Sequence, residues 1–133
     1  MLTKWLFSCV ILLIGISTNG QNIKKAKVLS VPLYVTSTFR ISCSQFDKSF
    51  IKEKKEVLLT EANVLKKIEG YLPMFKPTKL TGIDVRGKLI ICYRGGGDKI
   101  ICFDEFGHFF KDGIFYENHD LFNFLLLKNI IAY

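Results

Sequence analysis

The clearest alternation of apolar and polar positions covers residues 35–43. Every second residue there is one of Val35, Ser37, Phe39, Ile41 and Cys43, and many residues in the stretch are β-branched. A period of two with β-branched side chains predicts a half-buried strand with Cys43 on its inner face. A second, shorter strand is expected at residues 57–59.

Helical spacing appears in two later segments. Thr60 suits an N-cap and Glu61 a first helical turn, and the apolar positions that follow recur every three or four residues. This pattern predicts a helix over 61–72, with lysines on its outer side. Asn118 as an N-cap and Asp120 in the first turn predict a second helix near the end of the sequence. This helix is apolar on most sides, so it must pack against its own sheet or a partner.

Between the helices, turn signals divide apolar runs into two hairpins. Residues 83–94 and 99–105 flank three consecutive glycines, and residues 108–110 and 114–116 flank Asp112-Gly113. An Asp-Gly pair is a strong hairpin signal because glycine adopts positive φ without a Cβ clash. Strands joined by such short turns must be antiparallel.

The order of these elements predicts the α+β class. We expect a single antiparallel, meander-like sheet of about 4–6 strands with two helices packed on one face. The expected division is a signal peptide at 1–20, a loose basic lead-in at 21–30 and one α+β domain at 31–133. Without its first twenty residues the chain keeps 113 residues, enough for one core and too few for two.

The amino terminus has the pattern of a secretory signal peptide. Lys4 precedes a run of twelve mostly apolar residues, Trp5–Ile16, and Thr18 and Gly20 suit the positions before a cleavage site. A membrane-spanning helix needs about 20 such residues, so a retained anchor is less favoured, as is lipidation of Cys9. The sequence predicts export, either secreted or into a periplasm or cell envelope.

Positive charge is concentrated in the first half of the exported chain. Residues 21–79 hold 12 basic and 5 acidic residues, a net of +7, whereas residues 80–133 have a net of −1. Such an asymmetry attracts anionic partners, here an anionic glycan, a membrane surface or an acidic protein rather than nucleic acid. A solvated surface that aids solubility is the alternative. The candidate binding residues are Lys24, Lys25, Lys27, Lys52, Lys54 and Lys55.

Two cysteines flank the three glycines in the phrase IICYRGGGDKIICFD. A five-residue loop would place Cys92 directly opposite Cys102, within disulfide reach, and other loop lengths would not. Export permits a disulfide, but a Cys92–Cys102 bridge would leave Cys43 unpaired. Two interpretations remain open: buried thiols that act as small apolar side chains, or a Cys92–Cys102 disulfide.

Signals for catalysis and metal binding are weak. Cys92 and Cys102 are ten residues apart, and His108 and His119 are eleven apart. Neither spacing fits the close ligand pairs of a structural zinc site. Asp104, Glu105 and Asp112 near His108 could bind a cation, although turns commonly collect acidic residues. The glycines lack the following G-K-[ST] of a phosphate-binding loop. No metal and no cofactor is expected.

These observations favour a small, exported, non-enzymatic binding module whose basic first half engages an anionic or protein partner. One alternative is a structural or assembly component of a cell-envelope complex, suggested by the apolar closing helix. Another is a small hydrolase or metal-dependent enzyme centred on His108. The sequence identifies neither the partner nor the oligomeric state.

Overall fold

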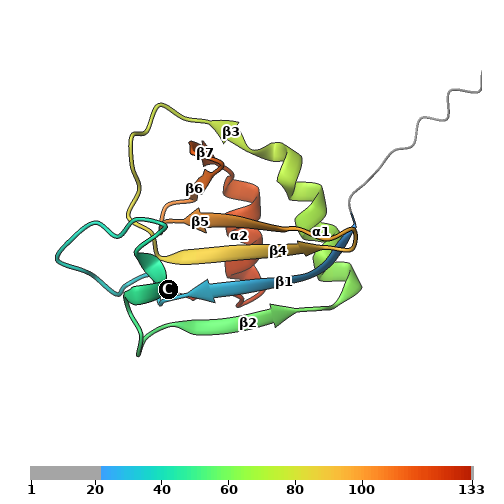
Figure 1. Ribbon diagram of the computed structural model, residues 1–133, viewed down its shortest axis with the longest axis horizontal. Coiled ribbons are helices and arrows are strands. Elements are labelled where there is room, and N and C mark those ends of the chain that lie inside the picture. Colours follow the sequence, from blue (N-terminus) through green and yellow to red (C-terminus); the bar gives the residue numbers. More distant parts are fainter. Residues whose placement is uncertain (1–21, 133) are drawn as a thin grey trace, which may run out of the picture.

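The structure, a computed structural model, describes residues 22–132; the predicted signal peptide lies outside the described residues. The fold is α+β, with a single antiparallel sheet in the order β2-β1-β4-β5-β6-β7-β3 (Figure 1). Seven strands exceed the expected number. They are β1 (Ile23–Ser30), β2 (Lys55–Leu59), β3 (Lys76–Pro77), β4 (Gly87–Tyr93), β5 (Asp98–Phe103), β6 (His108–Lys111) and β7 (Ile114–Glu117).

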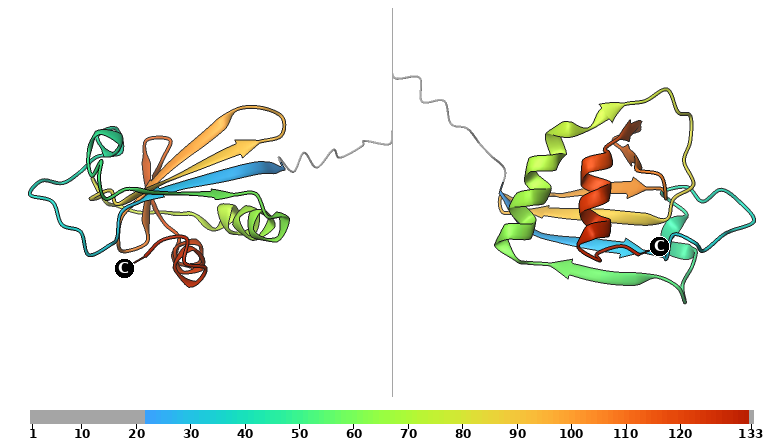
Figure 2. Two further views of the ribbon diagram at one scale, coloured as in Figure 1. Left: turned by 90° about the horizontal axis from the view of Figure 1, so that it is seen from below. Right: turned by 180° about the vertical axis from the view of Figure 1, so that it is seen from behind.

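Both predicted helices are confirmed, as α1 (Ala62–Tyr71) and α2 (His119–Leu127). They cover the same face of the sheet, as the view from behind shows (Figure 2). Asn118 caps α2 as expected, because its side chain accepts a hydrogen bond from the Leu121 N–H (3.1 Å). The cap of α1 is Glu61 rather than Thr60, and its side chain makes no capping bond.

The main core lies between the helices and the sheet. Its centre consists of fully buried side chains from α1, α2 and the middle strands. The apolar side chains around α2 pack into this core, as a helix that is apolar on most sides requires. Leu127 is the exception on α2, since 82% of it is exposed. The fully buried members are Ala26, Val28, Ile68, Leu89, Ile91, Ile101, Phe103, Phe109, Leu121 and Leu125.

Residues 21–30 were expected to form a loose lead-in, but Ile23–Ser30 form the strand β1. This strand is hydrogen-bonded to β2 on one side and to β4 on the other. A register shift between Ile23 and Lys25 leaves Lys24 as an extra residue in the strand. Ala26 and Val28 then point into the core. The bulge interrupts the alternation of apolar and polar residues, and lysines occupy the outward positions. The sequence of β1 therefore does not show the regular pattern of a strand.

The two predicted hairpins are confirmed as β4–β5 and β6–β7. In the first, Ile90 pairs with Ile100 and Cys92 with Asp98. In the second, Asp112 and Gly113 both adopt positive φ, as a tight primed turn requires.

The predicted strand at residues 35–43 is wrong. This stretch pairs with no strand, and Phe39, expected to point inward, is 77% exposed. Residues 35–54, here called the covering segment, pass over one end of the sheet face that the helices leave free. The segment includes the short helix η1 (Phe46–Lys48), which lies in front of the sheet in Figure 1. An alternating pattern also suits an extended segment without a neighbouring strand.

A disulfide fastens the covering segment to the sheet, between Cys43 and Cys102, with Cα atoms 5.7 Å apart. This corrects the hypothesis of a Cys92–Cys102 bridge. The observed register places Cys102 opposite Lys88 and Cys92 opposite Asp98, four residues apart along the hairpin, beyond the reach of a disulfide. Cys92 is the free cysteine of the described residues.

Buried cations provide further attachments for the covering segment. Arg86 donates two hydrogen bonds to Asp84 (2.7 and 2.9 Å) and one to the Val35 carbonyl (3.0 Å). The Lys88 ammonium, 8% exposed, lies 2.7 Å from a carboxylate oxygen of Asp47 at η1. A small apolar cluster around Phe46 and Cys102 fills the space beneath.

Candidate functional site

A basic pocket lies at the end of the molecule where β1 starts and β2 stops. The register places Ala26 opposite Leu59 and Ile23 opposite Tyr93, so the first turn of α1 and the β4–β5 turn meet at this end (Figure 1). The pocket has a volume of about 290 Å³. It is lined by Asn22, Ile23, Lys24, Thr60, Ala62, Leu65, Lys66, Glu69 and Arg94.

Three cations from three different elements line this pocket: Lys24 from β1, Lys66 from α1 and Arg94 from the β4–β5 turn. All three side chains are exposed, and within residues 22–132 none of them takes part in an ion pair. The Arg94 N–H donates to the Asn22 carbonyl (3.0 Å), which fixes the turn against the start of β1. The three cations therefore line one pocket and are available to an anion.

Glu69 is the acidic member of the pocket. One of its carboxylate oxygens is buried and lacks a hydrogen-bond partner. A buried polar atom without a partner is costly, so a donor brought by a ligand would satisfy it. With three cations and one carboxylate, the pocket has a formal net charge of +2.

The six predicted binding lysines do not form one patch. Lys24 lines the basic pocket, whereas Lys55 pairs with Ser30 at the opposite end of β1. Lys24 and Ser30 are six residues apart along β1, which is roughly 20 Å in a strand. Lys52 is exposed beside Lys55, and Lys54 is drawn inward, donating to the Asp47 carbonyl (2.6 Å).

Lys25 and Lys27 lie on the part of the sheet that the covering segment leaves bare. One row across four strands there consists of Leu58, Lys27, Ile90 and Ile100, directly opposite one another. Leu58 is 54% and Ile100 50% exposed. The Lys27 ammonium forms an ion pair with Glu56 at 3.2 Å, which weakens its attraction for an anionic ligand.

Cys92 lies in the next bare row, between Lys25 and Asp98. Burial raises the pKa of the Cys92 thiol, and the hydrogen bond and negative charge of Asp98 raise it further. The thiolate is the reactive form, so this environment does not favour a nucleophile.

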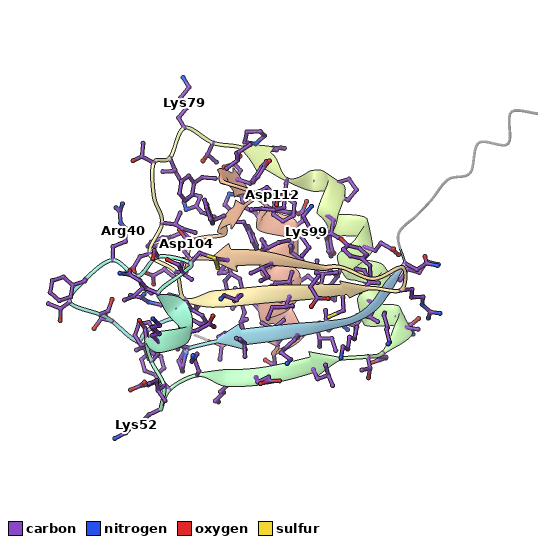
Figure 3. All side chains as sticks on the ribbon, in the orientation of Figure 1. Arg40, Lys52, Lys79, Lys99, Asp104 and Asp112 are labelled. Atoms are coloured by element: carbon purple, nitrogen blue, oxygen red, sulfur yellow. A yellow bond between two sulfur atoms is a disulfide. The ribbon has the colours of Figure 1, made fainter. Side chains whose placement is uncertain are left out.

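His108 is held by a buried acid, but the arrangement serves a turn. Asp104 accepts from the backbone N–H groups of Phe106 (2.8 Å) and His108 (2.9 Å), and contacts His108 Nδ1 (2.8 Å). These bonds shape the β5–β6 turn. Asp112 lies at the other hairpin end and pairs with Lys99 at 3.5 Å, so the acids proposed as a cation site are not brought together (Figure 3).

His119 lines a shallow hollow with Pro73, Lys76 and Glu117, and His108 is not among the lining residues. Within residues 22–132, no group of three or more His, Cys, Asp or Glu side chains could hold a metal ion. In the same range, no helix has the length and apolar character needed to cross a membrane.

Sequence reasoning missed two members of the basic pocket. Neither Lys66 nor Arg94 is among the six predicted binding residues: Lys66 contributes to the positive charge of the first half and to the outer side of the predicted helix, and Arg94 precedes the three glycines. Two features of the sequence point to these residues. Arg94 directly precedes a turn, and Lys66 lies in the first half of a helix, so both can lie near the start of a neighbouring strand. No protein-family model, curated protein or solved structure significantly matches this chain.

Proposed function

We propose that this protein is a small exported binding module that engages an anionic partner at the basic pocket of Lys24, Lys66 and Arg94. The observation that carries the proposal is the convergence of three unpaired cations from separate elements on one hollow. Converging charges hold an anion more strongly than the same charges spread over a surface, because their fields add at one point.

Two further observations support binding rather than catalysis. The thiol of Cys92 has a raised pKa, and the Asp104–His108 pair is occupied in shaping a turn. Apart from the exposed Leu127, the apolar side chains of α2 pack in the chain's own core, which removes the main motivation for an assembly component. Export itself rests on the pattern of the first twenty residues and on a disulfide, which suits an oxidising compartment.

The test measures retention of the protein on immobilised heparin as a function of salt. We expect retention at low salt and earlier elution of a triple variant, Lys24→Gln, Lys66→Gln and Arg94→Gln. The matched control removes the same charge elsewhere, with Lys52→Gln, Lys55→Gln and Lys79→Gln. If both variants shift equally, attraction is diffuse and the pocket is not the site. Absence of retention by the native protein, on heparin, anionic vesicles and a polyglutamate resin alike, would sink the proposal.

A further inference from the structure

A second pocket lies at the opposite end of the sheet, beneath the covering segment. Its volume is about 380 Å³, within the range typical of sites for small organic molecules. The floor is apolar: Phe110 and Phe115, with ring centroids 4.9 Å apart, lie beside Ile83, Val85 and the disulfide of Cys43. An apolar floor of this kind suits a hydrocarbon or aromatic group.

The rim of this pocket is polar. It carries the hydroxyls of Ser42, Ser44 and Thr81 and the guanidinium of Arg40. Arg40 is exposed, and in the described part of the chain it has neither an ion-pair partner nor a side-chain hydrogen bond. In Figure 3, Arg40 and Lys79 both lie at the end of the molecule remote from the start of β1.

The Arg40 guanidinium lies directly against Gly82. A Cβ on Gly82 would lie 2.7 Å from Arg40 Nη1, so the guanidinium rests directly on the bare glycine backbone. The backbone of Gly82 has an ordinary, negative-φ conformation, and alanine is therefore tolerated there apart from this contact.

The backbone beneath Arg40 is firmly held. The Ile41 N–H donates to Asp84 Oδ1 (2.7 Å), and the Ile41 carbonyl accepts from the Val85 N–H (2.8 Å). Asp84 also accepts two hydrogen bonds from the buried Arg86, whose positive charge compensates the negative charge of the Asp84 carboxylate. The Cys43 disulfide fixes the next turn. Arg40 therefore stands on a preorganised rim.

We infer that this pocket binds a small organic acid: a molecule with one carboxylate and an aromatic or branched apolar body. Arg40 binds the carboxylate, since a guanidinium matches the two oxygens of a carboxylate in a bidentate pair. The apolar body lies on Phe110 and Phe115, and the serine and threonine hydroxyls accept or donate at the rim. This site is independent of the basic pocket and adds a second ligand class to the molecule.

The test is titration of the native protein with hydrocinnamate, followed by NMR and calorimetry. Hydrocinnamamide, which keeps the ring but lacks the charge, is the ligand control. We expect shifts of the Phe110 and Phe115 signals, weaker binding of the amide, and a roughly 10- to 100-fold loss for Arg40→Gln, as for a lost charge-assisted hydrogen bond. Lys79→Gln removes an exposed charge outside the pocket lining and should leave the affinity unchanged.

Gly82→Ala supplies a second variant that keeps the charge. Its methyl group displaces the guanidinium from its resting place and should change the affinity for the acid while the affinity for the amide stays constant. An unchanged chemical-shift pattern in the helices confirms folding of each variant. Equal affinity for acid and amide, or an Arg40→Gln variant with native affinity, would overturn the assignment.

A peptide that ends in phenylalanine presents the same ring and carboxylate on a larger body. Tighter binding of this peptide than of hydrocinnamate would replace the small acid by a protein C-terminus as the occupant and so contradict the inference. Loss of hydrocinnamate binding in the triple variant of Lys24, Lys66 and Arg94 would place the ligand at the other end of the molecule and also contradict it.

Discussion

The two faces of the sheet are covered by different means. On one face, α1 and α2 bury a continuous set of aliphatic and aromatic side chains, without an ion pair inside it. On the other, the covering segment has no regular structure beyond η1, and it buries only a small cluster. A disulfide, the Arg86 hydrogen bond to the Val35 carbonyl and the Lys88–Asp47 pair attach it.

The comparison shows how an irregular segment is fixed when it has few apolar side chains to bury. Burial stabilises by about 25 cal/mol per Å² of apolar surface, so a small cluster contributes little against the entropy of ordering twenty residues of chain. Covalent and charge-assisted bonds add the remainder. They also fix the backbone around Arg40, which burial alone, being non-directional, would not do.

The largest effect should come from the helix-covered face. Phe109 is fully buried and packs against Phe75 and Phe103, with ring centroids 5.2 and 5.9 Å away. We expect Phe109→Ala to lower the free energy of unfolding by roughly 3–5 kcal/mol. Phe115→Ala, on the other face, removes a half-buried ring and should cost clearly less in the same urea titration. Equal costs would show that the two faces are packed alike.

The next largest effect should follow removal of the disulfide. Cys43 and Cys102 are 59 residues apart, and opening a loop of this size costs about 2–4 kcal/mol. In the double variant Cys43→Ala, Cys102→Ala, hydrogen exchange should accelerate in residues 35–54 and remain slow in α2. Uniform acceleration over the whole chain would contradict a locally attached covering segment.

A smaller effect is expected at the Lys88–Asp47 pair. Asp47→Ala leaves the Lys88 ammonium almost buried without its carboxylate, and we expect a loss of about 1–2 kcal/mol because Asp47 itself is largely exposed. Adding Lys88→Met removes the unpaired charge and should restore most of the stability. A double variant no more stable than Asp47→Ala alone would argue against desolvation of Lys88 as the cause.

The smallest effect concerns the bare rows of the sheet. Because its pKa is raised, Cys92 has less thiolate at neutral pH than an ordinary thiol and should react slowly with iodoacetamide. Asp98→Asn removes a cause of the raised pKa and should speed alkylation by less than about tenfold. Lys25→Gln should slow it, since Lys25 lowers the pKa. Mapping of the alkylated peptide measures the rates, and identical rates in the two variants would remove Asp98 and Lys25 as causes.

The amino-acid sequence predicts the local structure of this protein correctly. Both hairpins, both helices and the Asn118 cap follow from residues only a few positions apart. It failed at β1, where the bulge at Lys24 breaks the alternation, and at residues 35–43, where alternation occurs without a neighbouring strand. The sequence also groups Lys24 and Lys55 as one basic patch, whereas in the structure they lie near opposite ends of β1.

The α+β class, the two hairpins and the Asn118 cap follow from the amino-acid sequence, because dihedral preferences and side-chain periods act within one element. The partner of Cys102, 59 residues away, and the two pockets, whose linings come from separated segments, depend on the tertiary fold. Register determines which side chains are neighbours, and register depends on contacts between strands that no local pattern contains. Cys92 and Cys102 are symmetric in the sequence, yet one is a free thiol on a bare row and the other holds the covering segment.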